Sequence, residues 1–138
     1  MVEVEGEVFD GLGEAAYYVS QSGYRRQFIS KLGFEPFPGT LNIRLRSPVD
    51  RKVRRDLASE KSIHIDGFQD GKRTYGGAEC FRSLINRDSS CAVLVIERTS
   101  YDDSVLEIIA PISLRKSLHL KAGSKVAVKI FLNGSGSG

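Results

Sequence analysis

Short β-rich segments separated by turn residues run along most of this chain. In each segment, β-branched and aromatic residues cluster or polar side chains alternate with apolar ones, which predicts a strand. Tyr24–Leu32 instead has apolar side chains at helical spacing and ends at Gly33, so it predicts the main helix. Residues 50–60 are charged and do not distinguish a helix from a loop. Many short strands with one main helix are typical of a β-barrel. We expect strands at residues 2–8, 16–20, 40–45, 62–68, 73–81, 91–99, 105–110 and 125–132.

The strand expected at 40–45 follows a rigid turn, Pro36–Gly39. Its prolines fix φ and disfavour helix in the residues before them, while its glycine permits backbone geometry that a β-carbon would forbid. Alternation along the strand then places Thr40, Asn42 and Arg44 on one face. A hydroxyl and an amide carbonyl two residues apart suit a hard cation whose charge is balanced mainly by nucleotide phosphates, as that of Mg²⁺ often is. The alternative is a half-buried strand whose polar face only meets water.

The composition indicates one globular domain over residues 1–132, followed by a flexible Gly/Ser tail at 133–138. The apolar runs are far shorter than the roughly 20 residues of a membrane-spanning helix, and the N-terminus has no secretory pattern. We therefore expect a cytoplasmic protein without membrane contact. Cys80 and Cys91 have neither metal-binding nor disulfide spacing, and we expect both to be buried thiols. The two histidines are isolated and give no zinc pattern.

Positive charge is concentrated in residues 44–55, although the whole chain carries a formal net charge of only +3. A basic patch of this kind can attract phosphates. The alternative is a solvated surface, because no aromatic residues are interleaved with the basic ones as they are in proteins that bind single-stranded nucleic acids.

A glycine-rich loop follows the first expected strand, within Gly6–Ala16. Backbone N–H groups exposed in such a loop can surround phosphate oxygens. The loop lacks the Gly-Lys-Ser/Thr of a Walker A motif, and the strand expected after it differs from the helix of a dinucleotide-binding turn. A tight β-turn without a ligand is the alternative.

The expected strands 91–99 and 105–110 flank the polar turn Ser100–Asp103, which predicts a hairpin. Thr99 lies near its tip and Glu107 lies on the returning strand, so the two can face one pocket. A carboxylate in such a pocket could orient or deprotonate a substrate hydroxyl. The alternative is a surface glutamate in a strand.

Three blocks, Gly6–Glu14, Leu32–Asn42 and Glu107–Arg115, resemble in this order the archaeal CTP-dependent riboflavin kinases. The resemblance covers nearly the whole folded chain. It implies a mainly β fold, a six-stranded cradle-loop β-barrel with one main helix and short helical segments. It also implies a reaction in which riboflavin and CTP give FMN and CDP.

The same resemblance implies the roles of particular residues. Thr40 and Asn42 would bind one Mg²⁺ ion together with the nucleotide. Thr99 and Glu107 would contact the flavin, with Glu107 placing the ribityl 5′-hydroxyl as a catalytic residue. Ala15 departs from the glycine expected in the family, which puts the shape of its loop in question. The cytidine nucleotide would contact Gly11, Leu12, Gly13, Glu14, Ala15, Ala16, Ile112, Ser113, Leu114 and Arg115.

Two other functions remain open. The pattern in Leu118–Val128 is similar to the swapped-hairpin repeat of AbrB-type proteins, so a DNA-binding regulator of that class is one alternative. A barrel that binds flavin or nucleotide without catalysis is the other. For a kinase we expect riboflavin, FMN, CTP and CDP as partners, no nucleic acid, and a monomer, because a closed barrel needs no partner strand.

Overall fold

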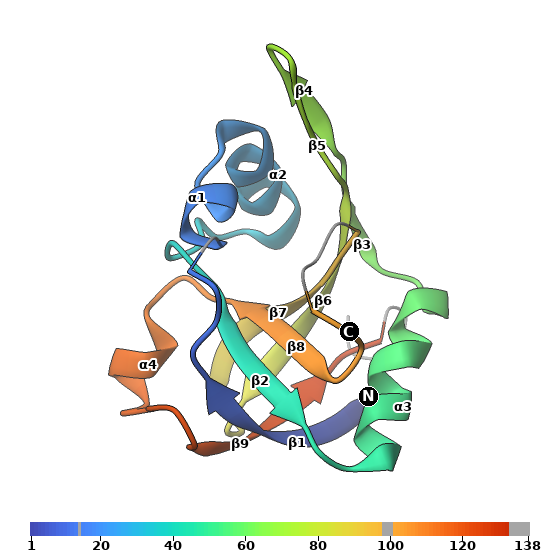
Figure 1. Cartoon of the computed structure of the whole chain (residues 1–138), viewed down its shortest axis with the longest axis vertical. Coiled ribbons are helices and arrows are strands. Elements are labelled where there is room, and N and C mark those ends of the chain that lie inside the picture. The colour runs from blue at the N-terminus through green and yellow to red at the C-terminus, as the bar shows by residue number, and fades with distance from the viewer. Residues whose placement is uncertain (14, 98–100, 133–138) are drawn as a thin grey trace.

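A six-stranded antiparallel barrel forms the centre of the computed structural model, which describes residues 1–13, 15–97 and 101–132 (Figure 1). The strands pair in the order β6-β7-β8-β2-β1-β9, and β9 pairs back to β6, which closes the barrel. This confirms the fold class expected from the sequence. The barrel strands are β1 (Val2–Phe9), β2 (Leu41–Leu45), β6 (Ala78–Ile85), β7 (Ser89–Ile96), β8 (Val105–Ile109) and β9 (Lys125–Ile130).

The helices and the remaining strands lie around the barrel. Strand β3 (Ile63–Ile65) pairs with the first residues of β6. Strands β4 (Phe68–Asp70) and β5 (Arg73–Tyr75) form a hairpin that projects beyond the barrel beside two helices (Figure 1). These are α1 (Ala15–Val19) and α2 (Ser22–Leu32). On other sides of the barrel lie α3 (Pro48–Asp56), a 3₁₀ turn (Leu57–Ser59) and α4 (Leu114–Ser117).

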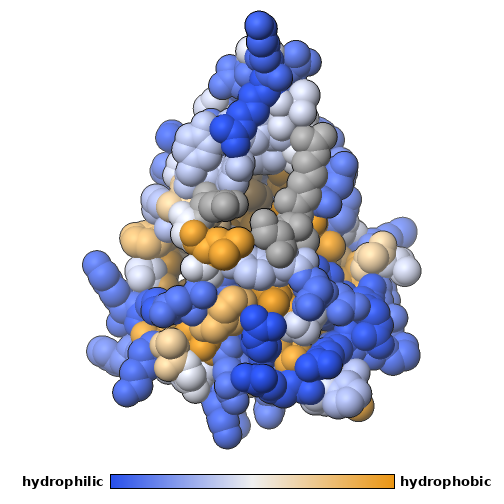
Figure 2. All heavy atoms as spheres, viewed as in Figure 1, coloured by the Kyte–Doolittle hydropathy of each residue, from blue (hydrophilic) through white to orange (hydrophobic). Residues whose placement is uncertain are grey.

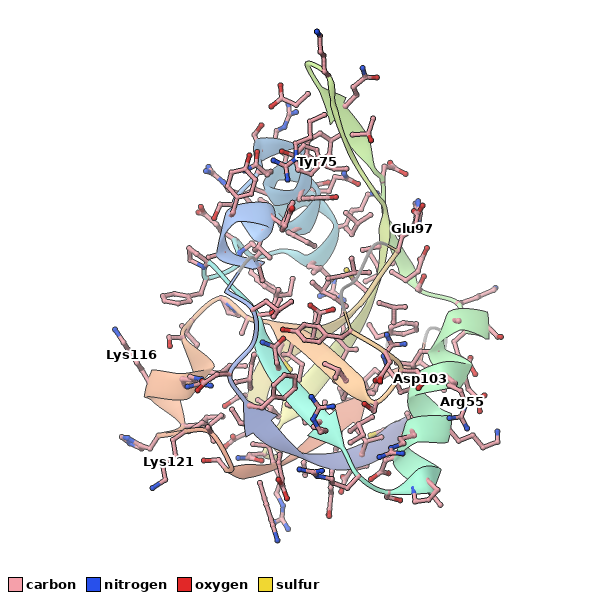
Figure 3. All side chains as sticks on the ribbon, viewed as in Figure 1. Arg55, Tyr75, Glu97, Asp103, Lys116 and Lys121 are labelled. Atoms are coloured by element: carbon pink, nitrogen blue, oxygen red, sulfur yellow. The ribbon has the colours of Figure 1, made fainter. Side chains whose placement is uncertain are left out.

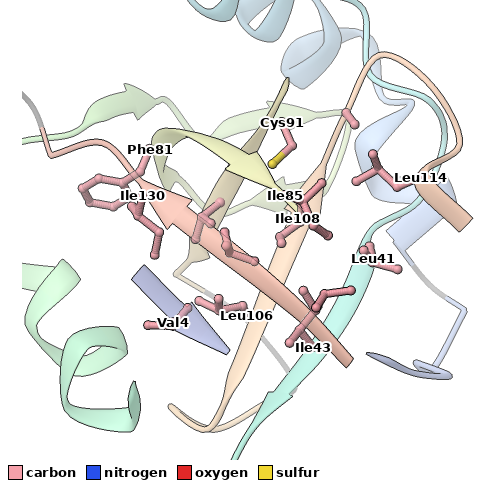
Figure 4. Close-up of a cluster of buried hydrophobic side chains, with 14 of the residues drawn as sticks. Val4, Leu41, Ile43, Phe81, Ile85, Cys91, Leu106, Ile108, Leu114 and Ile130 are labelled. Atoms are coloured by element: carbon pink, nitrogen blue, oxygen red, sulfur yellow. The ribbon is translucent and has the colours of Figure 1, made fainter. Parts of the chain in front are cut away.

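Apolar side chains from all six barrel strands fill the interior (Figure 4). A second cluster lies outside the barrel, where Phe28 and Leu32 of α2 pack against β6 and β7. Strand β7 contributes to both, with Val93 in the interior and Leu94 in the outer cluster. Burial on both faces explains why this strand is a continuous apolar run rather than an alternating one.

The two cysteines are free and buried, as expected from the sequence. Burial raises the pKa of Cys80 and of Cys91 to about 12, so both thiols stay protonated and unreactive at neutral pH. In the part of the chain that the structure describes, no helix has the length and hydropathy needed to cross a membrane.

The strand expected at 16–20 is wrong, because this segment forms helix α1. Tyr17 and Tyr18 favour strands intrinsically, but no strand among the described residues pairs with this segment. Buried Val19 packs in the outer cluster, and the Ser20 hydroxyl donates to the Ala16 carbonyl as in a helical turn. The dinucleotide-binding pattern is still absent, since β1 and its neighbours are antiparallel.

Two other expected strands are interrupted, and the ambiguous segment is helical. The segment 62–68 is divided between β3 and β4, and 73–81 between β5 and β6. Both breaks contain a glycine at which two backbones approach closely. A β-carbon on Gly67 would lie 2.4 Å from the Tyr75 carbonyl oxygen, and one on Gly77 would lie 2.9 Å from the Ile65 carbonyl oxygen. The helix that covers most of the charged segment, α3, begins just before it: Ser47 caps α3 by accepting from the Val49 amide, and Pro48 occupies the first turn.

Replacing Leu106 by alanine is expected to destabilise the protein by about 2–5 kcal/mol, because the side chain is fully buried in the barrel interior and the cavity would remain. Denaturant unfolding followed by far-UV circular dichroism measures this loss. The exposed Val49→Ala on α3 is the matched control and should change stability by less than about 0.5 kcal/mol. Equal stability of the two variants would contradict the assigned interior.

Candidate active site at two adjoining cavities

Two cavities adjoin at the start of β2. The larger, of about 280 Å³, lies between the barrel, helices α1 and α2, and strand β5. The smaller, of about 250 Å³, lies between the loop after β1 and Arg115 of α4. Ligands in the two cavities would therefore meet at a common boundary. We call this boundary the shared wall, and it consists of the residues that line both cavities, Gly13, Ala15, Thr40 and Asn42.

Thr40 and Asn42 lie together on this wall, as their alternation in the sequence predicts. The Thr40 hydroxyl donates to Oδ1 of Asn42 over 3.1 Å, and the Asn42 side chain is nearly buried. Each oxygen keeps a lone pair for another partner. Among the described residues, no group of three or more His, Cys, Asp or Glu side chains is placed to hold a metal ion. A cation at this wall would therefore depend on ligand oxygens in addition to these two.

Glu107 lies beside Asn42, because the two residues are directly paired across β8 and β2. Its side chain lines the larger cavity and is only 8% exposed. Behind it, Nε of Arg54 in α3 donates to the Val105 carbonyl over 3.0 Å. Burial lowers the pKa of Arg54, whereas the negative charges of Glu107 and Asp103 raise it. A buried guanidinium therefore lies near the Glu107 carboxylate. The structure thus brings together the predicted metal residues and the predicted catalytic residue.

Aromatic side chains form the far side of the larger cavity, and sequence reasoning missed them. The Tyr24 hydroxyl donates to the Gly76 carbonyl over 2.6 Å, and the Tyr75 ring stacks on Phe68 with centroids 4.6 Å apart. The Arg73 guanidinium lies 5.2 Å from the Tyr75 ring centroid (Figure 3 labels Tyr75). Flat apolar surfaces of this kind suit a planar ring system. The aromatic residues that line the cavity are Tyr18, Tyr24, Phe28, Tyr75 and Tyr101.

The described residues of the glycine loop, 11–13, and the first two residues of helix α1 line the two cavities. Gly11, Ala15 and Ala16 line the smaller cavity, and Leu12 lines the larger one. Gly11 is required for close packing, because a β-carbon there would overlap Nδ2 of Asn42 and lie 2.7 Å from the Tyr101 hydroxyl. Glu14 and Thr99, both predicted to bind ligands, lie outside the described residues.

The residues of the second segment predicted to bind the nucleotide, 112–115, differ in whether they line a cavity. Among the described residues lining the two cavities, Arg115 is its single member, and its guanidinium pairs with Asp10 over 2.6 Å. The Ser113 hydroxyl caps α4 by accepting from the Lys116 amide. Leu114 packs in the barrel interior and Ile112 is exposed.

The basic residues in 44–55 are paired within the protein. Hydrophilic side chains cover most of the face in view (Figure 2). Arg55 points toward Asp103, at 3.7 Å (Figure 3), and Arg44 lies 4.6 Å above the Phe9 ring. Most of these basic side chains therefore bind other residues of the same chain. The pairs are Arg44 with Ser104, Arg46 with Glu7, Arg51 with the Leu45 carbonyl, Lys52 with Asp56, Arg54 with the Val105 carbonyl, and Arg55 with Asp103.

Comparison with known proteins gives consistent matches. Residues 8–130 match the family model of the CTP-dependent riboflavin kinase domain, described as "Domain of unknown function DUF120". A riboflavin kinase of Methanosarcina barkeri is 46% identical over 98% of this chain and 59% of its own length. For the riboflavin kinases of Archaeoglobus fulgidus and Pyrobaculum aerophilum the identities are 44% and 49%, each over 95% of this chain. The chain spans 55% and 61% of those two relatives.

Proposed function

Because the chain belongs to the family of CTP-dependent riboflavin kinases, we propose that it transfers the terminal phosphate of CTP to the ribityl 5′-hydroxyl of riboflavin, giving FMN and CDP. The observation that carries this proposal is the shared wall. Two cavities of different character meet at Thr40 and Asn42, with Glu107 adjacent. A kinase needs this arrangement, because phosphoryl transfer depends mainly on placing two substrates in line.

The chemistry of each cavity supports an assignment of its ligand. The larger cavity, with its aromatic side and one carboxylate, suits the planar flavin ring with the ribityl chain directed toward Glu107. The smaller cavity, with the glycine loop and Arg115, suits the phosphates of the nucleotide. The preference for cytosine rests on the family and not on these contacts.

The donors at the shared wall fit a magnesium ion that arrives with the nucleotide. Thr40 and Asn42 supply two hard, neutral oxygens 3.1 Å apart. Neutral oxygens alone hold Mg²⁺ weakly, whereas carboxylates and phosphates supply most of its binding energy in proteins. When bound, the ion would neutralise charge on the phosphates of the nucleotide.

The residues of the chain then position the reacting groups. Glu107 accepts a hydrogen bond from the 5′-hydroxyl and directs the hydroxyl oxygen toward the terminal phosphorus of CTP. A bond forms from this oxygen to phosphorus while the bond from phosphorus to the bridging oxygen of CTP breaks, so CDP leaves. A loose transition state needs no strong base, and the hydroxyl proton passes late in the step to an oxygen of the transferred phosphoryl group.

Glu107→Gln is expected to lower kcat by about 10-fold and Glu107→Ala by about 100-fold, because orientation of the hydroxyl matters more than proton uptake. Initial rates of FMN formation at saturating substrates measure both. Glutamine keeps an oxygen that accepts a hydrogen bond but cannot take a proton. Equal losses in the two variants would assign proton uptake to Glu107, and no loss in either would remove it from the site.

A single assay tests the function. Purified protein is incubated with riboflavin, Mg²⁺ and either CTP or ATP, and FMN is resolved by chromatography. We expect FMN with CTP and much less with ATP. If neither nucleotide gave FMN, the proposed kinase activity would be contradicted. If CTP and ATP gave equal amounts of FMN, only the proposed preference for cytosine would be contradicted.

A further inference from the structure

The loop between β7 and β8 is held firmly at residues 101–105. The Ser104 amide and hydroxyl both donate to Asp102, and these bonds are the main reason that the pKa of Asp102 is lowered, followed by the charges of Arg44 and Arg51. The residues on either side of Ser104 are also bound by arginines: Asp103 pairs with Arg55, and the Val105 carbonyl accepts a hydrogen bond from Arg54. The basic stretch thus fixes this loop, and we call residues 101–105 the arginine-held loop.

Tyr101 extends from this loop to the glycine loop. Its ring packs edge-on against Phe9 with centroids 5.7 Å apart, and Arg44 lies over the Phe9 ring. Its hydroxyl accepts a hydrogen bond of 2.9 Å from the Leu12 amide. The ring contact sets the direction of the side chain, and the hydroxyl fixes one backbone amide of the glycine loop.

The same hydroxyl lies where the glycine loop touches the shared wall. The space at the Gly11 α-carbon is closed by two groups, the Tyr101 hydroxyl and the Asn42 amide. Tyr101 lines the larger cavity, whereas Gly11 lines the smaller one and Asn42 lines both. A displacement of the glycine loop would therefore change both cavities at once.

We infer that Tyr101 is a positioning residue that holds the glycine loop against Asn42 and couples ligand binding in the two cavities. This inference rests on the proposed function for the identity of the two ligands. A ligand in the larger cavity that contacts Tyr101 also stabilises its hydrogen bond to the glycine loop, which raises affinity in the smaller cavity. Coupling between two binding sites is reciprocal, so a ligand in the smaller cavity has the same effect on the larger one.

The test compares Tyr101→Phe, which keeps the ring contact with Phe9 and loses the hydroxyl, with the wild-type protein. Loss of the hydrogen bond to the Leu12 amide should weaken CDP binding and raise KM for CTP by about threefold to tenfold, with a smaller change in kcat. Titration calorimetry with CDP, in the absence and presence of FMN, measures the coupling. We expect FMN to tighten CDP binding in the wild type and to tighten it much less in the variant.

A matched control and a second measurement separate the possible outcomes. Tyr17→Phe removes a tyrosine hydroxyl from a residue that lines neither cavity, so it should leave CDP binding in the absence of FMN unchanged. Hydrogen exchange of the Leu12 amide, measured without ligands, should be faster in Tyr101→Phe. Unchanged exchange, or unchanged CDP affinity and coupling, would overturn the inference. Failure of the wild type to form FMN would instead reject the proposed function, while the exchange experiment would still test the contact.

Discussion

Replacing Asn42 by alanine is expected to lower kcat for FMN formation by about 100-fold or more, because stabilisation of phosphate charge by a metal contributes several kcal/mol and each 1.36 kcal/mol is tenfold in rate. The Asn42 side chain accepts from Thr40 at the shared wall and does not belong to the barrel interior. The variant should therefore stay folded, with an unfolding midpoint close to that of the wild type. Initial rates over a range of Mg²⁺ concentrations measure the effect.

Asn42→Asp is the matched control for this prediction, because it keeps an oxygen at the same position and adds a negative charge. It should retain more activity than Asn42→Ala and should reach half-maximal rate at lower Mg²⁺. Full Mg²⁺-dependent turnover by Asn42→Ala would remove Asn42 from the proposed metal site.

Gly11→Ala is expected to lower kcat/KM by about 100-fold, because a displacement of about 1 Å in a positioned group can cost that much. The added methyl group would overlap the Asn42 amide and crowd the Tyr101 hydroxyl. Either the amide or the glycine loop must move, and both contribute to the two cavities. Steady-state kinetics with each substrate varied in turn would measure the loss.

Gly123→Ala provides the contrast. Gly123 has a φ of 92° with open space where a β-carbon would lie, and it precedes β9 away from both cavities. Alanine there should cost about 1–2 kcal/mol of stability from backbone strain and leave kcat/KM unchanged. If Gly11→Ala lost stability rather than activity, the close approach at Gly11 would have a structural role only.

The barrel could be predicted from the sequence because alternation along its strands is a local signal. Leu41 and Ile43 of β2 face the core, while Asn42 and the preceding Thr40 face the cavities, as the pattern indicates. Helix α1 could not be predicted, since its tyrosines favour strands intrinsically and the burial of Val19 in the outer cluster depends on the tertiary fold.

The aromatic side of the larger cavity was beyond sequence reasoning for a different reason. Tyr18, Tyr24 and Tyr75 come from two helices and a strand, and none of them belongs to a motif. Only the tertiary fold brings them together. Tyr101 was missed in the same way, because its partner Leu12 lies 89 residues away in the sequence. The basic stretch, by contrast, was visible in the sequence, but its partners in the arginine-held loop were not.

The shared wall also has a stereochemical consequence under the proposed function. Where the two cavities meet at one boundary, the phosphoryl group crosses from donor to acceptor in a single displacement. The configuration at phosphorus is then inverted, as expected for one in-line transfer. Both substrates must be present together, which defines a ternary complex as the reactive species and makes the order in which they enter a matter of kinetics alone.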